Sequence, residues 1–576
     1  MENLPEVLTR LTTRIDALED RVFFLEHSSE VSIPILPPAP ASLRIEAPQA
    51  AADSSFTEAG ATFAVLGKAM LGMAGAYLLR AVAESGSFPK LATVALAIAY
   101  AGMWLIWAVR VPAAQWFACT TYAATSALIL APMLWELALR FDILSPAAAA
   151  AVLAVFLLAA WALAWKRDLT SIVWVAAVAT AITAIALSIA THDLPPFLAV
   201  LLLMALLSEL AAASNRWLRI RSVAAAAADI TVWALISIYS SAANSRPDYP
   251  ILSTITLLAP AILLLLIYGV SIVLRTVALR HTIAWFEMCQ ATIAFLLAAG
   301  AILHFAPPIG AILFAIFCLL LSPACYAAVF LCFDALTERR NYHVFATWSA
   351  ALLLVGCFLA LSSSWIASCL AVAAILAAVT GVRASRLTLA YHGLIYLFAA
   401  AFASGLMRYA FHTLAGDLPS SPRSIVWIVA ATVVLFYAVS GGYSKKTSPH
   451  RLFDTLAATL AVGAVAATLI SALVALTATV ITPGASHVAV VRTLSACTLA
   501  LALATLGPRL QRIELVWAAY ALLALVAVKL LFEDLRQGHP EFIAASIFLF
   551  AVSLILVPQL AKKASKNLPA VQSGSS

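Results

Sequence analysis

The sequence predicts an all-α polytopic transmembrane helix bundle of about eighteen helices behind a short N-terminal cytoplasmic coiled coil. Of its 576 residues, 64% are hydrophobic and only 11% are charged, with a mean hydropathy of +1.00. Apolar runs of roughly 20 residues, each long enough to cross a bilayer as helix, follow one another after Gly60. Basic residues gather at every second connection between these runs. Soluble domains carry about 25% charged residues, so the expected partner of this surface is the lipid bilayer.

Residues 1–27 predict a cytoplasmic coiled coil. Their apolar residues alternate steps of four and three, with branched residues at a and Leu at d, and opposite charges such as Arg14 and Glu19 occupy g and e. This pattern favours a parallel homodimer through residues 4–25. The alternative is an amphipathic helix that lies on the membrane or on the protein itself. The predicted coiled-coil core consists of Leu4, Leu8, Leu11, Ile15, Leu18, Val22 and Leu25.

Three further regions follow the coiled coil. Residues 28–60 are rich in Pro and Ala and predict a disordered tether. Residues 61–560 form the predicted multi-pass transmembrane domain, and 561–576 a basic, disordered cytoplasmic tail. The predicted spans are 61–83, 91–109, 115–138, 145–165, 169–191, 194–213, 222–241, 253–274, 282–302, 309–333, 342–361, 364–382, 387–408, 424–443, 452–481, 488–506, 513–532 and 541–560. The run 452–481 is long enough to be tilted or broken, and no internal repeat is visible in the Ala-rich helices.

The connections alternate in charge, which predicts the topology. Those assigned to the cytoplasm carry Arg110, Lys166, Arg167, Arg216, Arg219, Arg221, Arg275, Arg280, Arg339, Arg340, Arg383, Arg386, Lys445, Lys446, Arg451, Arg509, Arg512, Lys562, Lys563 and Lys566. The outer ones carry only Lys90, Arg140, Arg246, Arg423 and Arg536. Positive residues stay inside, so both termini are expected in the cytoplasm and the chain in a bacterial inner membrane.

Composition and motifs exclude several classes of function. The net charge of +7 comes from helix-end pairs and forms no basic stripe, so no nucleic acid is expected as partner. The eight cysteines lie in apolar runs without metal-ligand spacing, so no metal or cofactor is expected. Phosphate-binding loops, zinc-protease motifs and nucleophile elbows are absent from the sequence. These absences favour a protein that is not an enzyme.

Five ionisable residues lie within predicted spans on the cytoplasmic side, and such groups are candidates for function because lipid solvates them poorly. If they converge, Lys68 would neutralise one carboxylate while another, its pKa raised by burial and like charge, binds and releases a proton or cation. The alternative is local structure, such as Glu209 pairing with Arg216 or Arg219. This inner layer consists of Lys68, Glu209, Asp229, Glu287 and His392.

A second, basic layer lies near the predicted outer ends. Either these side chains extend to the lipid headgroups, or they form an outward site for an anionic lipid or a lipid-linked glycan, with Arg408 and His412 one turn apart. Acidic neighbours such as Glu136 offer them simple ion pairing. The outer layer consists of Arg80, Arg408, His412, Arg492 and Lys529.

The first span has a face of small residues, Ala69, Gly72, Gly75 and Ala76, on which another helix can pack closely. It ends near Arg80-Ala81 and is followed by a Gly-Pro turn. Together with the coiled coil and the Pro-rich tether, this span resembles a family of predicted bacterial multi-pass membrane proteins that is itself a domain of unknown function. Members of that family tend to carry Lys and aromatic residues where this chain has Arg80 and Leu78.

The sequence leaves three functions open. The first is a transporter- or flippase-like protein of the cell envelope, indicated by the many spans, the short loops and the two charge layers. The second is a non-catalytic membrane scaffold that self-associates through its coiled coil. The third is an integral enzyme acting on a lipid-linked substrate, indicated by Arg80, Arg408 and His412.

Overall fold

The computed structural model describes residues 49–84, 89–112, 114–241, 247–333, 340–384, 386–415, 422–444, 451–478, 485–534 and 540–566. The chain divides into two compact units, residues 1–68 and residues 69–576. The described part of the first unit is the beginning of helix α2. All the predicted coiled-coil core residues, from Leu4 to Leu25, lie outside the described residues. The coiled coil and the dimer therefore stay predictions.

The described residues form helices and contain no strand, as the sequence predicts. The α-helices are α2 (Gln49–Glu84), α3 (Lys90–Arg110), α4 (Trp116–Trp135), α5 (Pro146–Arg167), α6 (Thr170–Ala190), α7 (Leu194–Ala213), α8 (Ile220–Ser240), α9 (Thr254–Val273), α10 (Trp285–Phe305), α11 (Pro308–Ala328), α12 (Arg340–Ala360), α13 (Ser363–Ala384), α14 (Leu387–Ser404), α15 (Leu406–Ala415), α16 (Ser424–Ser444), α17 (Arg451–Ala478), α18 (Ala485–Arg509), α19 (Ile513–Lys529) and α21 (Pro540–Lys566). Four π-helical turns continue α4, α9, α11 and α19: η1 (Glu136–Arg140), η3 (Leu274–Ala278), η4 (Val329–Phe333) and η5 (Leu530–Asp534).

Sixteen helices of the described chain are long and apolar enough to cross a membrane. Two shorter apolar stretches, Val94–Arg110 and Ser424–Ser440, coincide with the two remaining predicted spans. The chain is thus an integral membrane protein of the all-α polytopic class.

Helix bounds differ from the prediction at both ends of the transmembrane domain. Helix α2 begins at Gln49, so residues 49–60, predicted as disordered tether, are helical. This stretch is rich in Ala, the best helix former, and lies beyond the last proline of the tether. Helix α21 likewise continues to Lys566, into the predicted tail, because Ala and Lys extend it. Within the long predicted run 452–481, the described residues Arg451–Ala478 form one unbroken 28-residue helix, α17, about 42 Å in length.

The predicted span 387–408 is divided in two. Helix α14 ends at Ser404, and Gly405 adopts φ +81°, the left-handed conformation that ends many helices because it suits a residue without a Cβ atom. The Ser404 hydroxyl then accepts a hydrogen bond from the Leu406 N–H, at 3.3 Å, and the ten-residue helix α15 begins there. Arg408 therefore lies on α15 and not at the end of a long span.

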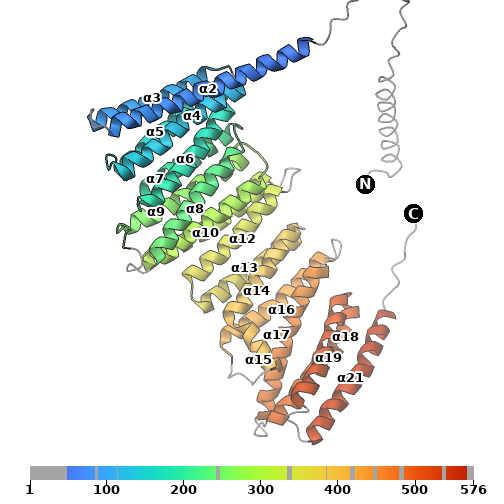
Figure 1. Cartoon of the computed structure of the whole chain (residues 1–576). Helices are drawn as coiled ribbons and strands as arrows, with labels where there is room; N and C mark the ends of the chain where they lie inside the picture. The colour runs from blue at the N-terminus through green and yellow to red at the C-terminus, as the bar shows by residue number, and fades with distance from the viewer. Residues whose placement is uncertain are drawn as a thin grey trace, which may run out of the picture. The chain divides into compact units, whose positions relative to one another are not determined.

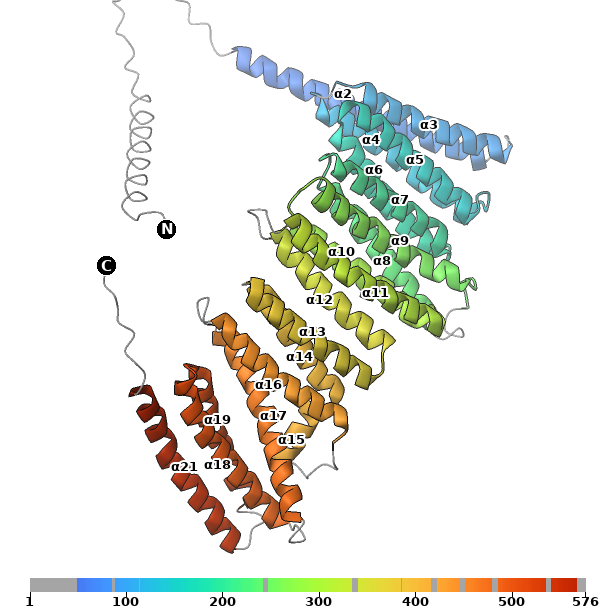
Figure 2. The same cartoon turned by 180° about the vertical axis from the view of Figure 1, so that it is seen from behind.

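Packing in the second unit is serial (Figure 1, Figure 2). Helices joined at the basic connections form the antiparallel hairpins α3–α4, α5–α6, α7–α8, α9–α10, α11–α12, α13–α14, α16–α17 and α18–α19. All substantial helix contacts are between elements close together in chain order, such as α4 with α6, α8 with α10 and α12 with α14. We call the helix ends at the hairpin turns the basic ends, and the others the opposite ends.

Arginines at the basic ends join each of several hairpins to the preceding one. Arg216 donates to the Trp165 carbonyl oxygen at 2.8 Å and lies 5.0 Å from the centre of its ring. Arg512 does the same on α16, with 3.0 Å to the Tyr437 carbonyl oxygen and 4.1 Å to the ring centre. The other members of the series are Arg167 on the Val109 carbonyl, Arg340 on the Trp285 ring and Arg386 on the Tyr342 ring. Each arginine either lies over an aromatic ring, which is a cation–π contact, or donates a charged hydrogen bond to a carbonyl oxygen toward the carboxyl end of a helix. Arg216 and Arg512 do both.

Two hairpin turns reveal an internal repeat that the sequence analysis missed. Residues 381–391, GVRASRLTLAY, align with residues 507–517, GPRLQRIELVW. In both turns the second Arg donates its backbone N–H to the Gly carbonyl oxygen, at 2.9 Å for Arg386 and 2.8 Å for Arg512. A Cβ atom at Gly381 or Gly507 would press on the carbonyl oxygen of that same Arg. The tight turn explains the glycine, and the link to the preceding hairpin explains the arginine.

We expect Arg512→Gln to lower the free energy of unfolding by about 1–2 kcal/mol, because it removes a charged hydrogen bond and a cation–π contact between hairpins. Arg509→Gln is the matched control, since Arg509 is an exposed arginine of the same turn. Thermal unfolding of the purified full-length protein measures both. Equal loss of stability in the two variants would contradict this role of Arg512.

Candidate functional site

Buried charges meet at the basic ends of α7, α8 and α10. Arg221 of α8 forms a bidentate ion pair with Glu209 of α7: Nε lies 2.8 Å from Oε1 and Nη2 lies 2.7 Å from Oε2. Its remaining nitrogen, Nη1, donates to Oε1 of Glu287 on α10 at 3.0 Å. The three residues are only 3–4% exposed. One guanidinium thus satisfies two carboxylates from different helices in place of water.

A second cation completes this cluster. Arg275 lies on the π-helical turn η3, and its Nε is 3.2 Å from Oε1 of Glu287. Ser271 of α9 donates to Oε2 of Glu209, and the backbone N–H of Ala284 donates to Oε2 of Glu287 at 2.9 Å. Two arginines therefore balance two glutamates, and the cluster as a whole is neutral.

Asp229 lies on the same helix as Arg221 but has a different partner. Its Oδ1 accepts a hydrogen bond from Nε2 of Gln290 at 2.8 Å. Gln290 follows Glu287 by one turn of α10, so α8 and α10 are joined at two successive levels. This carboxylate is held by a neutral amide and not by a cation.

The predicted inner layer does not gather at one point. Glu209 and Glu287 are brought together by Arg221, and Asp229 joins the same pair of helices through Gln290. His392 is bonded elsewhere: its Nδ1 lies 2.8 Å from the Tyr326 hydroxyl of α11, which lies 3.0 Å from the Tyr396 hydroxyl. Lys68 belongs to the first unit and its side chain is exposed.

Arg221 and Arg275, predicted in cytoplasmic connections, are both buried in the cluster. Arg216 and Arg219, the predicted alternative partners of Glu209, were wrong. Arg216 is bonded to Trp165, and Arg221 binds the glutamate. A sequence signal was present. Ser271 with Arg275, and Glu287 with Gln290, are polar pairs at helical spacing within otherwise apolar helices.

The outer basic layer is dispersed over several helices. Nη1 of Arg80 lies 2.8 Å from Oε1 of Glu136, so the predicted ion pairing is confirmed there. Arg492 donates to the His412 carbonyl oxygen at 3.2 Å, which joins α18 to α15. Lys529 donates to the Ala489 carbonyl oxygen at 2.8 Å and to the Thr493 hydroxyl at 3.0 Å. Arg408, on α15, is exposed.

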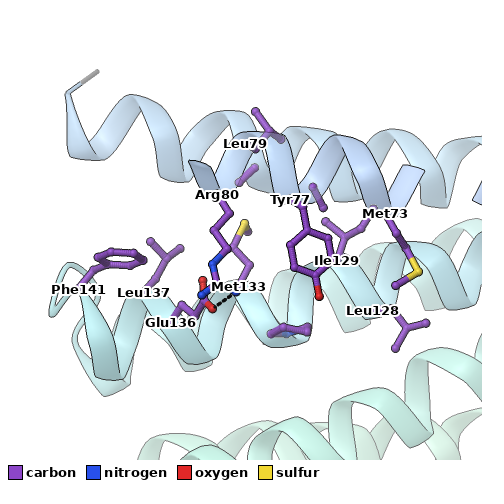
Figure 3. Close-up of a pocket in the computed structure, with 13 residues that line it drawn as sticks. Met73, Tyr77, Leu79, Arg80, Leu128, Ile129, Met133, Glu136, Leu137 and Phe141 are labelled. Atoms are coloured by element: carbon purple, nitrogen blue, oxygen red, sulfur yellow. Dashed lines mark ion pairs between the residues drawn. The ribbon is translucent and has the colours of Figure 1, made fainter. Parts of the chain in front are cut away.

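A pocket of about 190 Å³ surrounds the Arg80–Glu136 pair (Figure 3). Figure 3 shows Arg80 and Tyr77 extending from α2 toward α4, where Arg80 meets Glu136 at the start of η1. Apolar side chains such as Met73, Leu128 and Met133 line the rest. Beside the pocket, the small-residue face of α2 packs closely on α3, because a Cβ atom at Gly72 would overlap the Trp104 ring. The pocket is amphipathic: apolar walls with one charge of each sign at the opposite end of the helices.

No family model, curated protein or solved structure matches the chain. The family resemblance of the first span therefore stays a prediction. Within the described residues, no group of three or more His, Cys, Asp and Glu side chains is arranged to hold a metal ion.

We expect Arg221→Gln to lower the free energy of unfolding by about 3–5 kcal/mol, because it leaves two buried carboxylates without their main cation. Arg219→Gln, a change at an exposed arginine two residues away, is the control and should alter stability little. The additional change Glu209→Gln should restore part of the loss by removing one unpaired charge. Equal stability of the two arginine variants in thermal unfolding would show that the cluster does not stabilise the fold.

Proposed function

We propose that this integral membrane protein is a transporter- or flippase-like protein of the cell envelope that binds and moves amphipathic lipids. The observation that carries the proposal is the pocket between α2 and α4, whose apolar lining suits an acyl chain. Its ion pair matches a zwitterionic headgroup, with Arg80 facing a phosphate and Glu136 facing an ammonium group. In this proposal the membrane is the bacterial inner membrane and both termini are cytoplasmic, which the alternation of basic connections supports.

The buried charge cluster supports a structural role better than ion coupling. Both of its glutamates are paired with arginines. Protonating either carboxylate, or breaking its ion pair, would leave a buried arginine without its partner. Lipid movement in this proposal therefore depends on the pocket and not on a proton or cation bound at Glu209 or Glu287.

The purified full-length protein, reconstituted in vesicles that contain fluorescent phosphatidylethanolamine, tests the proposal. We expect faster exchange of this lipid between leaflets than in protein-free vesicles. Leu128→Trp fills the pocket mouth and should slow the exchange at least tenfold. Leu78→Trp is the control, because Leu78 is an exposed leucine of α2 outside the pocket. Exchange no faster than in empty vesicles, with folded protein, would refute lipid movement.

A scaffold is the second candidate, and serial packing favours it. Because each hairpin packs on its neighbours in the chain, the array leaves many large apolar side chains exposed to lipid or to other membrane helices. The predicted coiled coil would add self-association. No observation on the described residues favours the third candidate, an enzyme for a lipid-linked substrate, since Arg80 is paired with Glu136 and Arg408 lies on the separate helix α15.

Deleting residues 1–58 separates the two candidates in cells. A scaffold that depends on its coiled coil should lose its function on this deletion, whereas a lipid transporter should keep most of its lipid-exchange activity. The measurement is lipid exchange in reconstituted vesicles together with the growth phenotype of the cells, at matched protein levels. Loss of both readouts would instead indicate that the segment is needed for folding.

A further inference from the structure

A groove lies between α12 and α14. Its walls come from these two helices alone, and its volume is about 530 Å³, within the range of roughly 300–1,000 Å³ typical of small-molecule sites. The lining residues are His343, Thr347, Ala350, Ala351 and Leu354 on α12, and Leu387, Thr388, Tyr391, His392 and Ile395 on α14. The groove is therefore long, mostly apolar and polar at one end.

The polar end of the groove is at the basic ends of the helices. His343 and Thr388 lie there, with Nδ1 and Oγ1 3.4 Å apart. Leu354 lies about 21 Å along α12 from Arg340, the first residue of that helix, at 1.5 Å per residue. The walls between are mostly apolar, with Thr347, Tyr391 and His392 among the Ala, Leu and Ile side chains. The groove thus starts at the membrane surface and runs into the hydrocarbon region.

Basic residues are concentrated around this end. Arg340 begins α12, Arg383 lies in the last turn of α13, and Arg386 directly precedes α14. The Arg340 guanidinium lies 5.1 Å from the centre of the Trp285 ring of α10 and does not line the groove. The sequence contains no Asp or Glu from 340 to 416, and the connection before Arg340 carries Asp334 and Glu338, which lie outside the described residues. Among the described residues of helices packed on α14, the one carboxylate is that of Asp454 on α17, and it is buried. The mouth is therefore cationic.

The groove also lies at a junction where neighbouring hairpins have limited contact. On its C-terminal side, α12 has its substantial contacts with α13 and α14 alone. His392, which lines the groove, is held in place by Tyr326 of α11. A molecule in the groove would contact both hairpins and strengthen their junction.

We propose that this groove binds an anionic phospholipid from the leaflet at the basic ends. Its phosphate lies near His343 and Thr388, which line the groove, and near Arg386, which directly precedes Leu387 of the lining. One acyl chain runs along Ala351 and Leu354. A basic mouth above an apolar groove between transmembrane helices recognises that combination of anionic head and apolar tail. This site is separate from the α2–α4 pocket, and the proposal holds whether or not the protein moves lipids.

The test uses the full-length protein, delipidated in an uncharged detergent and titrated with phosphatidylglycerol or phosphatidylcholine. We expect phosphatidylglycerol at about a hundred times its Kd to raise the unfolding midpoint by about 2–4 °C, and phosphatidylcholine to have little effect. Native mass spectrometry should show one retained phosphatidylglycerol. Equal shifts with the two lipids would overturn the proposal, because the cationic mouth would then not contribute to recognition.

Two matched variants place the lipid. Ala351→Phe fills the groove from an exposed position, and should weaken phosphatidylglycerol binding at least tenfold while leaving the lipid-free midpoint unchanged. Ala431→Phe, at an exposed alanine of α16 away from the groove, should bind like the parent protein. Arg386→Gln should reduce the preference for phosphatidylglycerol over phosphatidylcholine. Unchanged binding in Ala351→Phe would overturn the proposal, and unchanged lipid exchange in that variant would show that the α2–α4 pocket acts independently.

Discussion

The contact of a basic-end arginine with the hairpin before it is the interaction on which the array depends. Apolar helices gain little by leaving lipid for one another, because lipid tails are as apolar as Leu. Packing and a few polar contacts must therefore set which helices meet and at what height. Arg216 and Arg512 do so by binding a carbonyl oxygen and an aromatic ring of the preceding hairpin. Arginines at the hairpin turns thus align neighbouring hairpins, and the same residues carry the charge alternation from which the topology is predicted.

The cluster around Arg221 is the most buried form of the same principle. It connects the α7–α8 hairpin to α9–α10 through two carboxylates and a second arginine. A neutral cluster of this kind costs less to bury than isolated charges, but it leaves little freedom for exchange of protons or ions. Two amphipathic cavities, one at Arg80 and one between α12 and α14, give room for a ligand at opposite ends of the helices. We propose a lipid for each.

Much of the fold follows from short-range features of the sequence. The length of the apolar runs predicts the spans, and the alternating loop charge predicts the direction in which each span crosses the bilayer. Both depend on the bilayer and not on tertiary contacts. The errors also have local causes. Gly405 ends α14 within an apolar run that length alone cannot divide. Residues 49–60 are helical because Ala outweighs the polar residues around it.

The sequence by itself determined that the chain is an all-helical membrane protein and that certain ionisable residues lie within its spans. Only the tertiary structure decided their partners. Arg221 is 12 residues from Glu209 and 66 from Glu287, and His392 is 66 from Tyr326. Apolar periodicity is weak in helices that face lipid on one side and protein on the other, so it does not specify which side chains meet. Pairing among buried charges depends on helix neighbours and rotation, which are set when the hairpins pack.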